Sequence, residues 1–344
     1  MTNTSQAIAS DYAIWGSIVV LALAMLAFVA YLSIAGAASE RKADRVARER
    51  ELVGAGAVGE GAAGVDAAGR GGASVGRAGA DDGAVVPKGP AAPERARRFG
   101  VIGLQLTWLA TLLVIAGTVL RALSVSRAPL GNMYEFALGT ACLALLVYSV
   151  WSVRQPRLWL GAFVVLPSLL ILGAAKIWWY TEASQLMPAL DNIWLIIHVS
   201  IAILSIALFV IGAALAVAYL LRDSAERKGR VKGWLASLPA ATKLEQLTYG
   251  VHIFAFPMWT FAVISGAIWA EQAWGRYWGW DPKETWSFVI WVVYAAYLHA
   301  RATSGWTTRK ATWVAIAGIV CIIINYTVVN LLMTGLHSYS GVST

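Results

Sequence analysis

Long apolar runs dominate this chain and decide what it can fold into. Hydrophobic residues make up 58% of its 344 residues and charged residues only 13%, whereas about a quarter is charged in a typical soluble protein. A helix needs roughly 20 apolar residues to cross a bilayer, and several runs exceed that length. A transmembrane β-barrel would show a much weaker, alternating pattern. The sequence therefore predicts an all-α polytopic membrane protein with about eight transmembrane helices.

The apolar runs also divide the chain into three parts. Residues 1–38 are predicted to hold an extra N-terminal transmembrane helix, because their apolar run is too long for a signal peptide. Residues 39–98 are rich in Ala and Gly with mixed charges, which predicts a disordered cytoplasmic linker. Residues 99–344 form the main membrane domain. The eight expected helices cover roughly Tyr12–Ala37, Gly100–Leu120, Met133–Val153, Leu158–Ile177, Ile193–Leu221, Leu247–Ala270, Thr285–Ala302 and Ala311–Thr334.

Basic residues set the expected orientation, because Lys and Arg concentrate in cytoplasmic loops. They gather between the third and fourth, the fifth and sixth, and the seventh and eighth runs, at Arg154, Arg157, Arg222, Arg227, Lys228, Arg230, Lys232, Arg301, Arg309 and Lys310. One orientation satisfies all three loops, with the N-terminus and the C-terminus outside. The outer segments are then Ser124–Asn132, Tyr180–Asn192, the loop after the sixth run and the tail after Thr334.

Charge and cysteine usage exclude other functions. The net charge of +8 reflects these loops and does not indicate a nucleic-acid partner. Cys142 and Cys321 lie in separate apolar runs without a C-x-x-C motif, so a thiol–disulfide or zinc role is not expected.

Tryptophan is concentrated in one outer segment, residues 274–286, which reads W-G-R-Y-W-G-W-D-P-K-E-T-W. An interfacial belt accounts for some of the chain's 17 tryptophans. However, Trp274, Trp278 and Trp280 are separated by glycines that let the backbone approach a ligand. A belt and a flat apolar platform for a planar ligand both remain open. On such a ligand, Arg276 and Lys283 could pair with acidic groups.

The second half of this segment has a local structural explanation. Asp281 suits a helix N-cap, Pro282 the first helical position, and Glu284 completes a capping-box pattern. D-P-K-E is therefore predicted to start the seventh helix.

The four histidines fall at two depths. His198 and His337 lie near the outer face, whereas His252 and His299 lie near the inner face, since His299 is roughly 27 Å along the helix from Asp281. A single buried histidine most often bonds a neighbouring helix, but ionisable groups inside a membrane are costly and often functional. Two imidazoles beside an aromatic surface are what bis-His ligation of haem iron requires.

The Trp-rich segment, followed by Y-L-H-A-R, resembles the haem-handling WWD proteins of cytochrome c biogenesis. Among these it is most similar to the CcsA/ResC type of System II, called CcsB in some bacteria. Three further elements agree with this family: P-L-G-N-M-Y-E-F (residues 129–136), L-T-Y-G-V-H-I-F-A-F-P (247–257) and G-L-H-S-Y (335–339). The resemblance covers about residues 100–340.

The resemblance implies that haem b is carried as cargo to the outer face of the plasma membrane. It would be presented on the surface of Trp274, Trp278, Trp280 and Asp281, with His198 and His337 as the external iron ligands. His299 would hold haem within the membrane, with a second ligand from a Ccs1/ResB-type membrane partner. His252 is not required by the family, and either packs between helices or serves as a second inner ligand.

The same resemblance implies partners and a reaction. The haem would be joined to C-x-x-C-H motifs of apocytochrome c, whose thiols a thioredoxin-like protein keeps reduced. The chain is then a subunit of a cytochrome c synthase (haem lyase) complex, contributing positioning and iron ligation, with no nucleophile or general base of its own. Two other functions stay open: a bis-His membrane cytochrome b for electron transfer, and a secondary transporter, for which no broken-helix repeat is seen.

Overall fold

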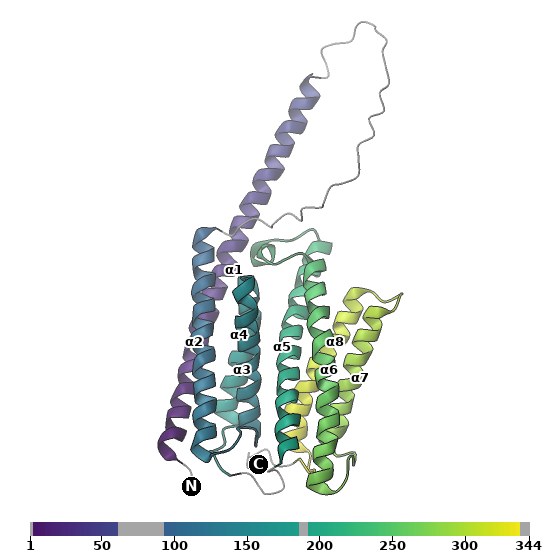
Figure 1. Cartoon of the computed structure of the whole chain (residues 1–344). Helices are drawn as coiled ribbons and strands as arrows, with labels where there is room; N and C mark the ends of the chain where they lie inside the picture. Colours follow the sequence, from purple (N-terminus) through teal and green to yellow (C-terminus); the bar gives the residue numbers. More distant parts are fainter. Residues whose placement is uncertain (1–2, 61–92, 186–191, 338–344) are drawn as a thin grey trace.

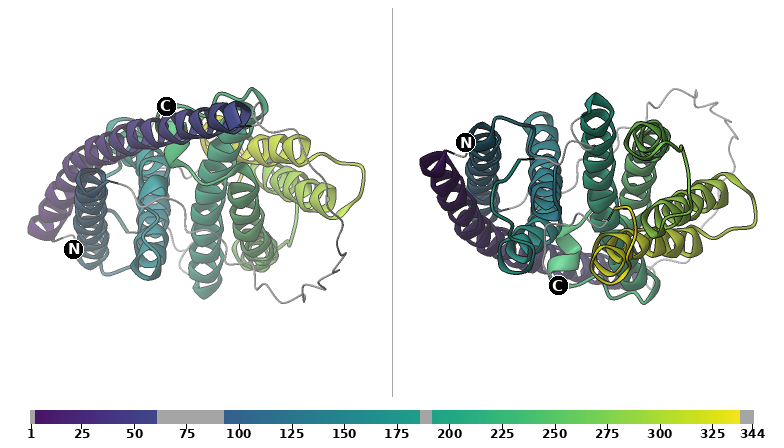
Figure 2. Two further views of the ribbon diagram at one scale, coloured as in Figure 1. Left: turned by 90° about the horizontal axis from the view of Figure 1, so that it is seen from above. Right: turned by 90° about the horizontal axis from the view of Figure 1, so that it is seen from below.

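The computed structural model describes residues 3–60, 93–185 and 192–337, and over these residues every regular element is helical. The elements are α1 (Thr4–Glu60), α2 (Glu94–Val125), α3 (Met133–Arg154), α4 (Leu158–Trp178), α5 (Ile193–Arg227), η2 (Gly233–Ser237), α6 (Ala241–Trp274), α7 (Pro282–Ala302), α8 (Thr308–Ile324), η3 (Asn325–Val329) and α9 (Asn330–Leu332). The long helices run side by side in one bundle (Figures 1 and 2). The chain is an all-α polytopic membrane protein, as the apolar runs predicted.

Within the described residues, 7 helices are long and apolar enough to cross a membrane. The helix that falls short of the expected eight is α7, with 21 residues. Lys283, Glu284 and Arg301 make it less apolar, although it packs against α6 and α8. The N–H of Asn3 donates to the carbonyl of Ser124 at 2.8 Å, so α1 begins beside the end of α2. Figure 1 places the end of α8 at this same end of the bundle. Which side of the membrane this end faces stays a prediction.

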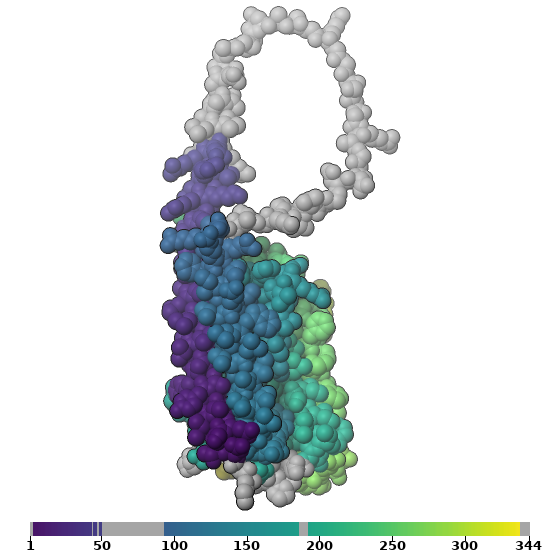
Figure 3. Space-filling model, turned by 60° about the vertical axis from the view of Figure 1, so that its left-hand side comes forward, coloured from purple at the N-terminus to yellow at the C-terminus, as the bar shows by residue number. Residues whose placement is uncertain are grey.

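The structure describes part of residues 39–98, the segment expected to be a disordered linker, and that part is helical. α1 continues to Glu60 and α2 begins at Glu94, and the stretch between residues 61 and 92 lies outside the described residues. Ala, Glu, Lys and Arg are strong helix formers, and Arg45 pairs with Glu49 one turn later. These local preferences extend α1 well beyond residue 38. Its upper part projects past the bundle, while the rest lies against α2 (Figure 3).

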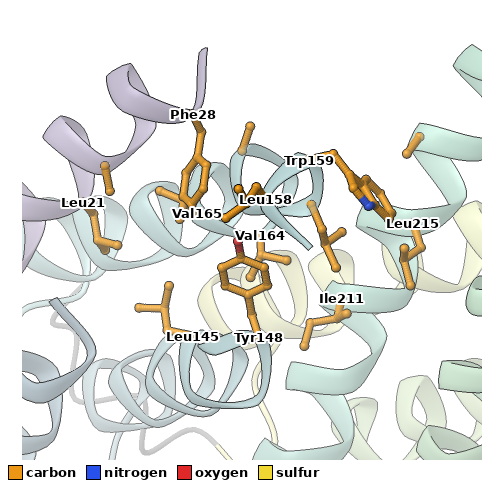
Figure 4. Close-up of a cluster of buried hydrophobic side chains, with 14 of the residues drawn as sticks. Leu21, Phe28, Leu145, Tyr148, Leu158, Trp159, Val164, Val165, Ile211 and Leu215 are labelled. Atoms are coloured by element: carbon orange, nitrogen blue, oxygen red, sulfur yellow. The ribbon is translucent and has the colours of Figure 1, made fainter. Parts of the chain in front are cut away.

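Although α1 precedes the region of resemblance, it is built into the bundle. At one end Asp11 pairs with Lys176 of α4 at 2.6 Å and accepts a hydrogen bond from the Tyr180 hydroxyl at 2.7 Å. At the other end Gly36 lies so close to Gly233 that an added Cβ would sit 2.2 Å from its carbonyl oxygen. Between these ends the Phe28 ring enters the core beside Tyr148 (Figure 4).

A buried ion-pair network holds the loops at the Asn3 end of the bundle. Glu135 is fully buried and accepts from Arg121 Nε at 2.9 Å, from Arg127 Nη1 at 2.8 Å and from the backbone N–H of Gly131 at 2.7 Å. The two arginines also donate to the carbonyls of Thr181 and Ser184. One carboxylate therefore joins α2, α3 and the segment after α4.

Replacing Glu135 with Ala should destabilise the protein strongly, because it leaves Arg121 buried without its anionic partner. Loss of one member of a buried pair costs about 3–5 kcal/mol, to be measured as the free energy of unfolding in detergent. The matched control is Glu94→Ala, which breaks an exposed pair with Arg98 and should cost less than about 1 kcal/mol. Equal losses in the two variants would contradict this account of the network.

Candidate functional site

The Trp-rich segment begins inside a helix. α6 was expected to end at Ala270 but continues to Trp274, where Gly275 adopts φ 72° and its N–H bonds the carbonyl of Glu271 at 2.7 Å. A left-handed glycine is a frequent helix terminator, because it has no Cβ to clash. Trp274 therefore belongs to the rigid last turn of α6 and not to the loop.

The helix start predicted at Asp281 is confirmed. Asp281 is the N-cap of α7, Pro282 is the first helical residue, and the capping box with Glu284 is complete. Glu284 Oε2 accepts from the N–H of Gly279 at 2.8 Å and from that of Asp281 at 3.0 Å. The loop between the two helices is thus fixed by the α7 side chain that closes the cap.

Asp281 also binds the chain's C-terminal segment. Its Oδ2 lies 2.8 Å from His337 Nδ1, and its Oδ1 accepts the N–H of Leu336 at 2.7 Å. Gly335 also lies against this carboxylate, since an added Cβ there would lie 2.3 Å from Asp281 Oδ1 and would push it out of place. Burial acts to raise the pKa of the Asp281 carboxyl, but the bonds from His337 and Leu336 outweigh it and hold this pKa below its ordinary value. Residues far apart in sequence therefore meet at one carboxylate.

His198 reaches the same place from α5. Its Nδ1 lies 2.7 Å from the carbonyl oxygen of Ala262 on α6. Because a carbonyl can only accept, Nδ1 carries the proton and the Nε2 lone pair is left for another partner. Gly266, one turn along α6, makes room for the ring: a Cβ there would lie 2.7 Å from His198 Cε1.

Trp269 connects the two histidines and was missed from the sequence. Its ring stacks on His198 with centroids 6.2 Å apart and an interplanar angle of 5°. It lies 5.8 Å from the ring of His337, and Trp274 lies 4.7 Å from that ring. The signal that could have revealed it is its helical position beside Ala262 and Gly266, which face His198.

The tryptophan rings of this segment do not lie in one plane. Trp278 and Trp280 meet edge to face at 90°, and Trp274 meets Trp269 at 69°. Perpendicular contacts of this kind are favoured by the ring quadrupole. Trp280 is 66% exposed, whereas Trp278 lines a cavity.

That cavity has a volume of about 170 Å³ and opens between α5, α6, α7 and the turns after α8. Both histidines line it, His198 on one element and His337 on another, together with Trp269. Its wall also includes Lys283, whereas Arg276 is exposed and lies outside the lining.

His252 and His299 do not line the cavity, and the two residues lie in different environments. His252 is fully buried, bonds the Thr248 carbonyl at 2.7 Å and packs on Tyr297 at 4.9 Å. His299 is exposed near the end of α7. Side chains two positions apart on an α-helix point in nearly opposite directions. Tyr297 and His299 therefore occupy different faces of α7. The packing alternative for His252 agrees with these contacts.

The donor set suits an iron porphyrin. Histidines that ligate a metal commonly donate their other ring N–H to an oxygen, which fixes the ring's orientation, and both imidazoles here are held in this way through Nδ1. The described residues hold no cluster of three or more His, Cys, Asp or Glu suited to a bare metal ion. A porphyrin ring supplies the remaining iron ligands itself and presents a flat apolar face to tryptophan.

Because His198 lies against Gly266, adding one methyl group at position 266 should strongly weaken ligand binding. Gly266→Ala should displace the imidazole and lower the affinity for haem about tenfold or more, because small misplacements of a ligand are costly. Gly250→Ala is the matched control on the same helix, since nothing lies within 4 Å of the added Cβ. Spectroscopic titration of the purified variants measures both. Similar affinities in the two variants would contradict the placement of His198.

The Asp281 carboxylate predicts a pH dependence. Its folded pKa is lowered, so its contribution to stability is fully present above the ordinary value of about 3.9 and is lost as the pH falls through the lower folded value. Asp281→Asn keeps a good N-cap without the charge. The melting temperature of the wild type should exceed that of Asp281→Asn at pH 7, with the difference shrinking below about pH 4. A constant difference across this range would exclude the proposed charge contact.

Comparison with known proteins places this site in a family. The family model described as Cytochrome C assembly protein matches residues 130–337. Cytochrome c biogenesis protein CcsA of Guillardia theta is 38% identical over 259 residues, or 69% of this chain and 85% of that protein. CcsA of Mesostigma viride is 32% identical over 265 residues, or 70% of this chain and 86% of that protein.

A solved structure shares the fold. Cytochrome c heme lyase CcmF superposes with a TM-score of 0.57 at 16% identity, covering 95% of this chain and 47% of that one. The present chain thus spans about half of that structure, and the likeness concerns the fold alone. The family match over most of the membrane domain and the similarity to the two CcsA proteins show that the chain belongs to the cytochrome c assembly family, as a CcsA-type biogenesis protein.

Proposed function

We propose that this protein presents haem at the outer face of the plasma membrane for covalent attachment to apocytochrome c. His198 and His337 would be the axial iron ligands, and Trp269, Trp274 and Trp278 would surround the ring. The observation that carries this proposal is that both imidazoles are held through Nδ1, by Ala262 O at 2.7 Å and Asp281 Oδ2 at 2.8 Å. A ring held in this way coordinates iron through Nε2.

The chemistry that haem supplies is a pair of vinyl groups that add the thiols of a C-x-x-C-H motif. The protein's own contribution is proximity and orientation: imidazoles fixed by oxygen atoms and tryptophans fixed on helices. The WWD residues divide this work. Asp281 orients His337, Trp274 packs on His337 and Trp278 lines the cavity, whereas the exposed Trp280 is left to contact a partner or the lipid surface.

His299 fits a second, inner role. Its exposed position near the end of α7 suits a haem ligand that is completed by another protein, for which we propose a Ccs1/ResB-type membrane partner. Haem b would pass from there to the cavity. A thioredoxin-like protein would keep the apocytochrome thiols reduced. The basic loops at the opposite end of the bundle support a cytoplasmic location for that end.

Replacing either outer histidine should abolish cytochrome c maturation. His198→Ala and His337→Ala each remove one axial ligand, and added imidazole should restore part of the activity by occupying the vacant position. Holocytochrome c is measured by haem staining in a host that depends on this protein.

His252→Leu is the internal control, because His252 packs between helices in this structure. It should retain maturation wherever the variant accumulates in the membrane. Normal holocytochrome levels in both outer-histidine variants would exclude the assignment. Tightly bound haem that cycles with quinone, without cytochrome c maturation, would favour a cytochrome b instead.

A further inference from the structure

One basic side chain, Lys283, lines the cavity that His198 and His337 share. Its Nζ donates to the Asn330 side-chain oxygen. Among the described residues, no carboxylate lies within ion-pair distance of this side chain; the nearby Asp281 carboxylate acts on it through space and is itself bonded to Leu336 and His337. An ammonium withdrawn from water without an anion is costly. An anionic ligand bound beside Lys283 would offset this cost.

The groups around Lys283 are polar and incompletely bonded. Asn325 is only 6% exposed, lines the same cavity, and its amide oxygen has no hydrogen-bond partner. Its amide nitrogen reaches Ser287 Oγ at 3.4 Å, a weak contact. A buried amide of this kind needs a further partner, either water or a ligand.

The backbone brings these side chains together. Residues 325–329 form a π-helical turn at the end of α8. In an α-helix, residues five apart point in widely different directions, but the wider π turn brings Asn325 and Asn330 nearer to one face. π turns of this kind are frequent at functional sites. Asn330 is itself fixed, because its side-chain nitrogen donates to the Tyr326 carbonyl at 2.8 Å. Its side-chain oxygen, which accepts from Lys283 Nζ, therefore holds the lysine in position.

We infer that Lys283, with Asn325 and Asn330, binds a carboxylate of the planar ligand held by the two histidines. This inference rests on the proposed function and adds to it a recognition site for the acidic edge of the porphyrin. Lys283 lines the same cavity as the imidazoles of His198 and His337. The histidines would then bind the iron, and Lys283 with the two asparagines would bind the carboxylate. Together these contacts fix the rotation of the porphyrin about the axis through its iron.

The test compares protoporphyrin IX with its dimethyl ester, which lacks the carboxylates, and repeats the comparison with the two iron porphyrins. Wild-type protein in nanodiscs should bind each acid about ten- to a hundredfold more tightly than its ester. Lys283→Gln should abolish this preference, and Lys283→Arg should retain it. Arg276→Gln is the matched control: its cation lies in the Trp-rich segment but outside the cavity lining, and the preference should be unchanged.

Several results would overturn the inference: equal binding of acid and ester by the wild type, an undiminished preference in Lys283→Gln, or no binding of any porphyrin. A preference that disappears only in nanodiscs containing anionic lipid would assign Lys283 to a lipid phosphate instead. If Lys283→Gln does not fold, Asn325→Ala should lower affinity for the acid by about two- to tenfold. The iron-free pair does not depend on histidine ligation, so it separates this inference from the proposed function. The latter fails if the iron porphyrins show no histidine-ligated spectrum.

Discussion

The carboxylate of Asp281 is the interaction on which the site depends, because it joins two parts of the chain that would otherwise be independent. As the N-cap of α7, it fixes where the Trp-rich loop ends and the helix begins. As the acceptor for Leu336 and His337, it docks the segment after α8 against that loop. A negative charge is favoured at a helix N-terminus, so the helix stabilises the same ionised form that orients the histidine. One side chain thus serves both the local fold and the ligand.

The opposite wall of the site depends on the absence of side chains. Gly266 leaves space on α6 for His198, which therefore packs tightly enough to reach the Ala262 carbonyl on the neighbouring helix. Transmembrane helices commonly use small residues for such close approach. Trp269 then fills the space beside both imidazoles. Gly266 and Trp269 therefore contact the same imidazole from neighbouring turns of α6.

The fold and much of the site could be predicted from the sequence because they follow from local patterns. Apolar runs gave the helices, D-P-K-E gave the start of α7, and both outer histidines do line one cavity. Three features could not be predicted. The extension of α1 required weighing helix propensity against a composition typical of disorder. The orientation of the tryptophan rings, and the role of Trp269, depend on contacts between α5, α6 and the C-terminal segment, which no local pattern encodes. The π turn that places Asn325 is likewise a consequence of packing at the end of α8.

His198 and His337, the two histidines that we propose as haem ligands, are held by different kinds of structure. His198 lies within α5 and is anchored to the backbone of α6, so moving it means moving packed helices. His337 lies on a turn after α9, outside the long helices, where it contacts the Asp281 carboxylate and the rings of Trp269 and Trp274. Segments with few buried contacts open at the lowest free-energy cost. If His198 and His337 hold the iron as we propose, and the histidine of an apocytochrome motif takes over one axial position, displacing His337 disturbs the packed helices less than displacing His198. Asp281 would then stay in place as the cap of α7 and keep the Trp-rich loop in its conformation during the exchange.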